Sequence, residues 1–177
     1  MGDPDWNEED YYDISFPRMG MTHAREVGTI AYRSGPEWEQ RFGQKRRDPD
    51  GVPDFCQDFE IEHYLLRQGE KFCEAYDPNS LLYISKAMDL FDMSNGYSSL
   101  EEGVQRVICP VLVLGITSDV LFPVQQQRDM SEVLQKSGNR NATYYEPTSI
   151  YGHDTFLLDV MNVGTAVKGH LESTLTV

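Results

Sequence analysis

An acidic residue and a histidine stand where a catalytic pair could form. Asp119 follows an apolar run over residues 111–116, and His153 follows a second short strand predicted over residues 142–146. An imidazole can take a proton from a hydroxyl and return it near neutral pH. A carboxylate on the far ring nitrogen fixes the tautomer and stabilises the imidazolium. Asp119 and His153 are therefore candidates for an acid and a base.

Their positions strengthen this interpretation. In open α/β sheets, functional side chains gather beyond the carboxyl ends of the strands. In α/β hydrolases the triad runs nucleophile, acid, histidine along the chain, and here His153 follows Asp119 by 34 residues. Either residue alone is more simply explained as a turn, capping or structural residue. The pair, each at the end of its own strand, favours a catalytic function.

A nucleophile is missing from the sequence. No Gly-x-Ser-x-Gly occurs, and Ser34 lacks the apolar strand that precedes a nucleophile elbow. Cys56, Cys73 and Cys109 are poor nucleophile candidates, because two sit on or beside predicted helices and the third precedes a strand. Cys56, His63 and Cys73 do not have the spacing of a zinc site, so we predict no metal centre.

The elements that must position these residues change character along the chain. The first 20 residues predict a loop, and Gly69 predicts a bend or a tight contact within a helix. The pattern predicts helices over residues 22–34, 58–76, 81–91, 98–107, 123–135 and 155–171, and strands over 111–116 and 142–146. The pattern of the second half therefore indicates a βαβα unit, which needs further parallel strands beside it.

Composition excludes several classes of function. The 177 residues carry 15 Lys and Arg against 29 Asp and Glu, a net charge of −14, which argues against nucleic-acid binding. No apolar stretch approaches the ~20 residues of a membrane helix. The N-terminus resembles no secretory or transit peptide, and three cysteines fit reduced thiols. We expect a protein of the cytoplasm, or alternatively of the mitochondrial matrix, that binds neither nucleic acid nor membrane.

Several segments resemble one enzyme family. Residues 110–127, with Asp119 within them, are similar to the acid motif of the homoserine O-acetyltransferase family, which includes closely similar serine O-acyltransferases. Residues 151–157 resemble its histidine motif, residues 64–80 its lid-helix signature and residues 24–34 the start of that lid. The resemblance covers nearly the whole chain in separate motifs, which makes it specific.

The resemblance implies an α/β class and the C-terminal part of an α/β-hydrolase fold. Residues 1–97 would form a mostly helical lid region, and residues 98–177 the C-terminal βαβα part of the core. The N-terminal sheet strands and the nucleophile elbow of that fold are absent, since family members are about twice as long. We expect the chain to be a C-terminal half that is inactive by itself.

The family also implies roles for single residues. Asp119 and His153 would be the acid and the base of the triad. Arg25 and Tyr32, seven residues apart, match the family's contacts to the substrate carboxylate, and a guanidinium fork suits that group. Asp154 would pair with the substrate's ammonium group.

The implied reaction is a ping-pong acyl transfer in methionine or cysteine biosynthesis. A serine takes an acetyl group from acetyl-CoA, a co-substrate rather than a bound cofactor, and gives it to the hydroxyl of L-homoserine or L-serine. Homoserine or serine, acetyl or succinyl donor, and monomer or homodimer all stay open. Two alternatives also stay open. One is an esterase-type α/β-hydrolase, and the other is a non-catalytic remnant or subunit that pairs through an exposed sheet edge.

Overall fold

The computed structural model describes residues 2–53 and 55–174, and the chain forms two compact units. The first unit comprises Met1–Ala31 and Trp38–Phe91, and the second comprises Tyr32–Glu37 and Asp92–Val177. The sequence placed the division after residue 97, whereas the compact units separate near residue 91. The second unit also includes a short segment of the expected lid, Tyr32–Glu37, which proves important for the site.

The first unit is helical. Its elements are the 3-10 helix η1 (Pro4–Glu9) and the α-helices α1 (Arg18–Ala31), α3 (Glu60–Ala75) and α4 (Pro78–Asp89), while α2 (Gly35–Arg41) begins in the second unit and ends in the first. The predicted loop over residues 1–20 is thus wrong in part, because η1 and the start of α1 lie within it. Helix α1 also ends at Ala31 rather than at Ser34. The reason is that Ser34 caps α2, its Oγ accepting a hydrogen bond from the Glu37 N–H over 3.2 Å.

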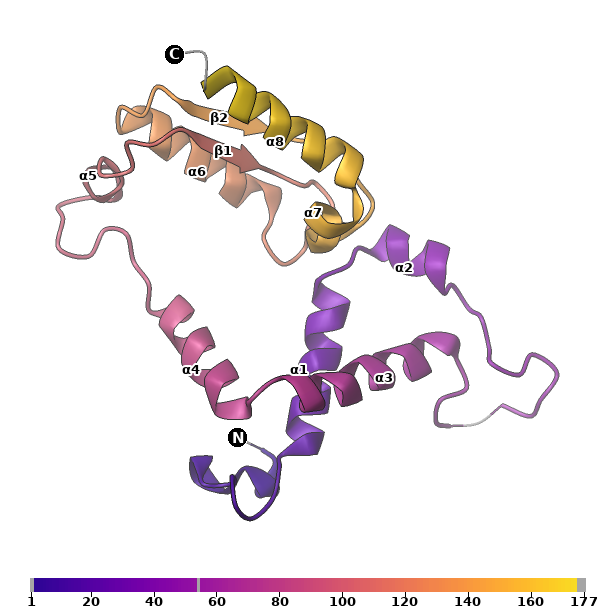
Figure 1. The fold of residues 1–177 in the computed structure, drawn as a ribbon. Coiled ribbons are helices and arrows are strands. Elements are labelled where there is room, and N and C mark those ends of the chain that lie inside the picture. The colour runs from indigo at the N-terminus through magenta and orange to yellow at the C-terminus, as the bar shows by residue number, and fades with distance from the viewer. Residues whose placement is uncertain (1, 54, 175–177) are drawn as a thin grey trace. The chain divides into compact units, whose positions relative to one another are not determined.

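Helices α1 and α3 cross within the first unit (Figure 1). The close approach occurs at Gly69, where an added Cβ would lie 2.6 Å from Thr22 Cγ2 and 2.8 Å from its carbonyl oxygen. Thr22 is buried, and its Oγ1 lies 3.4 Å from Cys73 Sγ. Gly69, which predicted either a bend or a tight contact, is therefore the site of a tight contact between α1 and α3.

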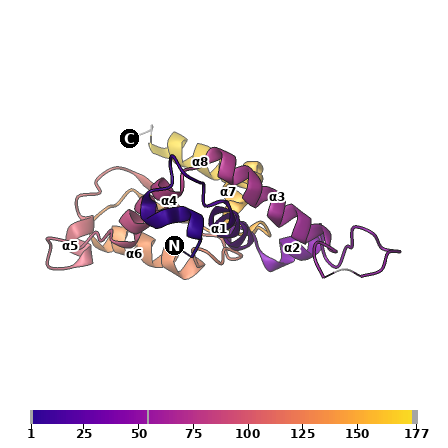
Figure 2. The same ribbon diagram turned by 90° about the horizontal axis from the view of Figure 1, so that it is seen from below.

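The N-terminal segment is held against α4 by hydrogen bonds, and the two lie beside each other in Figure 2. Tyr11, only 2% exposed, donates from its hydroxyl to Asp77, the residue that caps α4. Trp6 Nε1 donates to Asn79 Oδ1 over 3.1 Å. Burial raises the pKa of Tyr11, and its bond to Asp77 raises it further. Burial alone would raise the pKa of Asp77, but bonds from Tyr11 and Ser80 outweigh this and lower it.

The second unit contains the sheet. Its elements are α5 (Leu100–Val104), β1 (Val111–Leu114), α6 (Val124–Lys136), β2 (Ala142–Tyr145), the 3-10 helix η2 (Gly152–Asp154), α7 (Thr155–Leu158) and α8 (Val160–Thr174). Strands β1 and β2 are parallel, with Val111 opposite Ala142 and Leu114 opposite Tyr145. The predicted strand–helix–strand–helix order is confirmed, with both strands shorter than expected.

The two faces of the sheet meet different helices. Val113 and Ala142 are buried with Leu134 of α6, which also contacts both strands. On the other face, Leu112 and Thr143 line a hollow with residues of α8. Figure 1 accordingly shows α6 and α8 on opposite sides of the strands. Successive residues of a strand point to opposite faces, so the apolar residues of β1 face α6 on one side of the sheet and α8 on the other.

Two predicted boundaries in this unit are wrong. The cap of α5 is Ser99, which accepts from the Glu102 N–H, and not Ser98. The sequence contains two overlapping Ser-x-x-Glu patterns, and the predicted helix start at residue 98 corresponds to the first. The single helix predicted over residues 155–171 is two helices, because Asp159 adopts non-helical angles and caps α8 through a bond to the Asn162 N–H.

The apolar residues of the last helix are largely uncovered. Val160, Val167 and Leu171 are 67%, 41% and 55% exposed, and α8 has no buried residue among those described. A two-stranded sheet cannot bury both of its faces by itself. Within the described ranges, none of the helices has both the length and the apolarity to cross a membrane.

Candidate active site

The structure brings the two residues predicted to be acid and base together. His153 Nδ1 lies 3.0 Å from Asp119 Oδ2. Asp119 lies in the loop after β1, and His153 lies in η2 after β2. Parallel strands end at the same edge of a sheet, so the loops that follow them are neighbours. The pairing inferred from strand order is thus present in the structure.

Backbone donors hold the Asp119 carboxylate in one orientation. Its Oδ1 accepts hydrogen bonds from the N–H groups of Leu121 and Phe122, each 2.9 Å long. The side chain is 9% exposed, against 24% for His153. An ionised carboxylate can only accept hydrogen bonds, so Nδ1 carries a proton towards Asp119. Nε2 of the neutral ring is then left to accept a proton from a substrate or a nucleophile.

Aromatic rings surround the imidazole. The ring centroids of Phe122, Phe156 and Tyr32 lie 5.1, 5.8 and 5.8 Å from that of His153. Asp119, His153 and Gln127 share a cavity of about 130 Å³ with apolar neighbours. A ring confined in this way loses little freedom when it reacts, which is what positioned proton transfer requires.

The loop that carries His153 is tied to the loop that carries Asp119. Ser118 Oγ donates to the Ser149 carbonyl over 2.7 Å and accepts from the Gly152 N–H over 3.1 Å. Thr155, fully buried, closes the turn by donating to the Gly152 carbonyl over 2.7 Å. Gly152 has φ of +63°, a left-handed conformation that favours glycine. Acid and base are therefore positioned by one connected set of loop contacts.

The two residues expected to hold the substrate carboxylate belong to different units. Tyr32 lies in the second unit with His153, whereas Arg25 lies on α1 in the first, its guanidinium 5.1 Å from the centre of the Phe72 ring. The sequence placed both on one helix with seven-residue spacing. Because α1 ends at Ala31, that helical relation does not extend to Tyr32.

Asp154, expected to receive the substrate's ammonium group, already has a partner. Arg33 Nε lies 2.9 Å from Asp154 Oδ2, and Arg33 Nη1 lies 2.5 Å from Glu37 Oε1. Sequence reasoning missed both Arg33 and Glu37. The only sequence signal was that Arg33 directly follows the candidate residue Tyr32. No local pattern linked Arg33 to Asp154, which lies 121 positions later.

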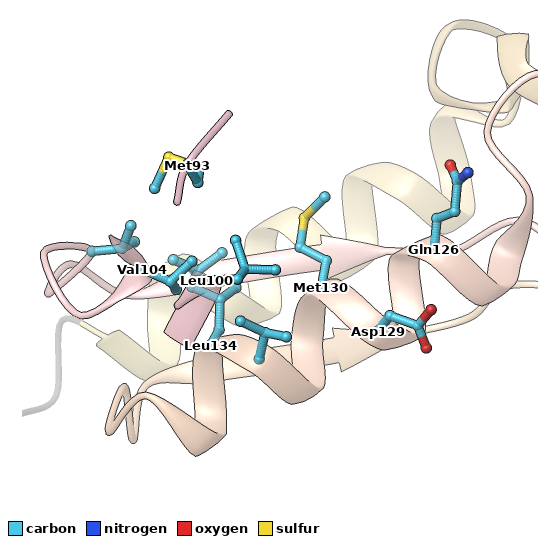
Figure 3. A pocket seen from close by; sticks show the side chains of 10 residues that line it. Met93, Leu100, Val104, Gln126, Asp129, Met130 and Leu134 are labelled. Carbon is cyan, nitrogen blue, oxygen red and sulfur yellow. The ribbon is translucent and has the colours of Figure 1, made fainter. Parts of the chain in front are cut away.

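A larger cavity in the same unit has no comparable chemistry. It measures about 520 Å³ and is lined mainly by apolar side chains of α5, α6 and β1 (Figure 3). Its polar members are Gln126 and Asp129, which lie together on α6. Among the described residues, no group of three or more His, Cys, Asp or Glu side chains could hold a metal ion. The site with acid–base chemistry is therefore the one at Asp119 and His153.

Comparison with known proteins finds similarity to two kinds of acyltransferase. It is 40% identical to the serine O-succinyltransferase of Emericella nidulans, with 97% of this chain and 46% of that protein covered. It is 41% identical to the homoserine O-acetyltransferase of Deferribacter desulfuricans, with 97% and 45% covered. The chain thus spans about half the length of the curated relatives it matches.

Solved structures agree on the fold. Homoserine O-acetyltransferase from Bacillus anthracis superposes with a TM-score of 0.77 at 26% identity, covering 94% of this chain and 44% of that one. Esterase E22 superposes with a TM-score of 0.79 at 20% identity, covering 96% and 46%, and this likeness concerns the fold alone. A family model described as the alpha/beta hydrolase fold matches residues 1–160. Since this match covers most of its length, the chain belongs to the α/β-hydrolase fold family.

Proposed function

We propose that this chain is the C-terminal half of an O-acyltransferase that moves an acyl group from a coenzyme A thioester to the hydroxyl of L-homoserine or L-serine. The observation that carries the proposal is the Asp119–His153 pair, whose oriented carboxylate leaves one imidazole nitrogen ready to accept a proton. The similarity to serine O-succinyltransferases and homoserine O-acetyltransferases supports acyl transfer as the reaction class.

In the first half-reaction, His153 Nε2 takes the proton of a serine hydroxyl supplied by the rest of the protein. The serine oxygen bonds to the thioester carbonyl carbon and the carbon–sulfur bond breaks. The imidazolium, stabilised by Asp119, returns the proton to the departing thiolate. In the second half-reaction, Nε2 takes the proton of the amino acid's hydroxyl. That oxygen bonds to the acyl carbon, and the proton passes back to the serine as its bond to the acyl group breaks.

The acceptor amino acid carries a carboxylate and an ammonium group, and the proposal assigns a contact to each. Tyr32, beside the imidazole, and Arg25 are assigned to the carboxylate. Asp154 is assigned to the ammonium group, because a carboxylate has about four acceptor sites and Arg33 occupies part of this capacity. Homoserine and serine differ by one methylene, worth about 1–3 kcal/mol of discrimination in a fitted pocket. The identities of 40% and 41% to the two kinds of relative do not separate them.

The test is release of coenzyme A by the whole protein that contains this chain. Purified protein is mixed with acetyl-CoA or succinyl-CoA, with homoserine, serine or neither, and free thiol is measured. We expect release that depends on an amino acid, with one donor and one acceptor clearly preferred. Release that proceeds equally fast without an amino acid would instead identify a hydrolase, and no release in any mixture would exclude the proposal.

Matched variants assign the activity to this chain. His153→Gln should abolish amino-acid-dependent release, whereas His170→Gln, at a helix histidine bonded to the Thr143 hydroxyl, should leave it unchanged. Arg25→Lys should raise KM for the amino acid while leaving KM for the thioester near its original value, because lysine cannot form the two-pronged contact to a carboxylate.

A further inference from the structure

A single arginine bridges two nearly buried carboxylates beside the histidine loop, residues 149–155. Arg33 contacts Glu37 through Nη1 at 2.5 Å and Asp154 through Nε at 2.9 Å. The three side chains are 15%, 9% and 17% exposed, so water screens them poorly. Charge-assisted bonds of this kind, made by a planar guanidinium, are strong and directional.

The segment over residues 32–34, which contains Arg33, also holds the histidine loop through hydrogen bonds that involve its backbone and Ser34. The Asp154 N–H donates to the Tyr32 carbonyl over 3.0 Å, and the Ser34 hydroxyl donates to the Ile150 carbonyl. The segment passes so close to Gly152 that an added Cβ there would lie 2.8 Å from the carbonyl carbon of Arg33. Residues 32–34 and the histidine loop therefore behave as one packed assembly within the second unit.

Arg33 supplies the positive charge that this assembly requires. Glu37 Oε2 is buried and accepts no hydrogen bond from the residues that the structure describes, so its carboxylate depends on the contact at Oε1. Removing the guanidinium would leave Glu37 and Asp154 as like charges in a poorly hydrated place. An uncompensated buried charge is strongly destabilising, and the loop that carries Asp154 would be expected to move outwards.

We propose that Arg33 is a positioning residue for the reaction. It fixes the carboxylate of Asp154, the residue directly after His153, and through it keeps the imidazole in register with Asp119. This inference rests on the proposed function, since it assumes that His153 activates a nucleophile. It assigns Arg33 no contact with the reacting atoms and explains why Asp154 has a cationic partner within its own unit.

The test follows acylation of the whole protein with p-nitrophenyl acetate, whose burst of nitrophenolate has an amplitude and a rate constant. The amplitude counts correctly folded sites, and the rate constant reports how well His153 is placed. Arg33→Met should lower the rate constant about 10- to 100-fold, the effect of displacing a reacting group by about 1 Å. The amplitude per molecule of total protein should stay near that of wild type, whereas a loss of folding alone would lower the amplitude and leave the rate constant of the remaining sites unchanged.

Three further variants sharpen the result. Arg33→Lys keeps the charge but cannot bridge both carboxylates in the same plane, so its rate constant should lie between those of wild type and Arg33→Met. Arg33→Met combined with Asp154→Asn should be no slower than the slower single variant, because both changes break the same contact. Arg128→Met, which removes a more exposed arginine–carboxylate pair with Glu146 in the same unit, should leave the rate constant unchanged.

The outcomes separate this inference from the function on which it rests. A wild-type protein without a burst would count against the proposed acyl-serine chemistry itself. A wild-type burst together with an unaltered rate constant in Arg33→Met overturns the positioning role. If Arg33→Met gives no folded sites, Arg33→Lys decides, and a rate constant equal to that of wild type would overturn the role there as well.

Discussion

Asp119→Asn offers the sharpest test of how the site works. In the wild-type protein Asp119 Oδ1 accepts two backbone N–H bonds, each 2.9 Å long, while Oδ2 faces His153 Nδ1 at 3.0 Å. An asparagine in this position has one acceptor and one donor end. Its oxygen must take the two N–H groups, because the NH₂ group cannot accept them. The NH₂ group therefore faces Nδ1.

This substitution reverses the tautomer of the imidazole without changing its surroundings. An amide donor facing Nδ1 makes that nitrogen an acceptor, so the proton of the neutral ring moves to Nε2. A protonated Nε2 cannot accept the proton of a nucleophile. In a serine protease the corresponding change lowers kcat by about 10⁴. We expect a loss of about 10³- to 10⁴-fold here, which corresponds to about 4 to 5.5 kcal/mol of transition-state stabilisation.

The assay is the nitrophenyl acetate burst of the whole protein, at equal concentrations of folded sites. The matched control is Asp129→Asn on α6, which changes an exposed carboxylate bonded to Gln125 and should leave the rate constant unaltered. Thermal unfolding should be nearly the same for wild type and Asp119→Asn, because the two backbone bonds are kept. A variant within about threefold of wild type would refute the assignment, since so small a change is below 1 kcal/mol.

The remaining predictions concern packing and pH. Gly69→Ala should lower stability by about 1–3 kcal/mol in thermal unfolding, because the new methyl would lie 2.8 Å from a carbonyl oxygen of α1. Gly164→Ala on α8, where nothing lies within 4 Å, should not be destabilising. Tyr11→Phe should cost about 1–2 kcal/mol at pH 7 in urea unfolding. Since the pKa of Asp77 is lowered in the folded protein, its stabilisation is present above about pH 4 and lost in stronger acid, so the cost should shrink at pH 3. Gly152→Ala should reduce both stability and the acylation rate constant, because its φ of +63° and its close backbone neighbour both exclude a side chain. A Gly152→Ala protein with wild-type acylation would contradict this account of the histidine loop.

The sequence by itself determined those features of the fold and of the site that depend on chain direction and on local residue patterns. The apolar run at β1 and the strand–helix–strand order predict a parallel pair. Chain direction then places the residues after both strands at one edge of the sheet, so the meeting of Asp119 and His153 required no distance measurement. The glycine on α3 likewise predicted either a bend or a tight contact, because glycine inside a helix costs about 1 kcal/mol relative to alanine, and the structure selects the tight contact.

Tertiary structure decided what depends on distant segments and on competing local signals. The sequence offers both Ser98 and Ser99 as caps for α5, each with a glutamate three residues later, and only the structure identifies Ser99 as the cap. The assignment of Tyr32 and Arg33 to the unit of the histidine follows from contacts with a loop more than 100 residues later. The Arg33 bridge to Asp154 has the same origin. Such contacts arise only when two backbones are already held side by side, and the interaction that holds them there is collective packing, which no local pattern encodes.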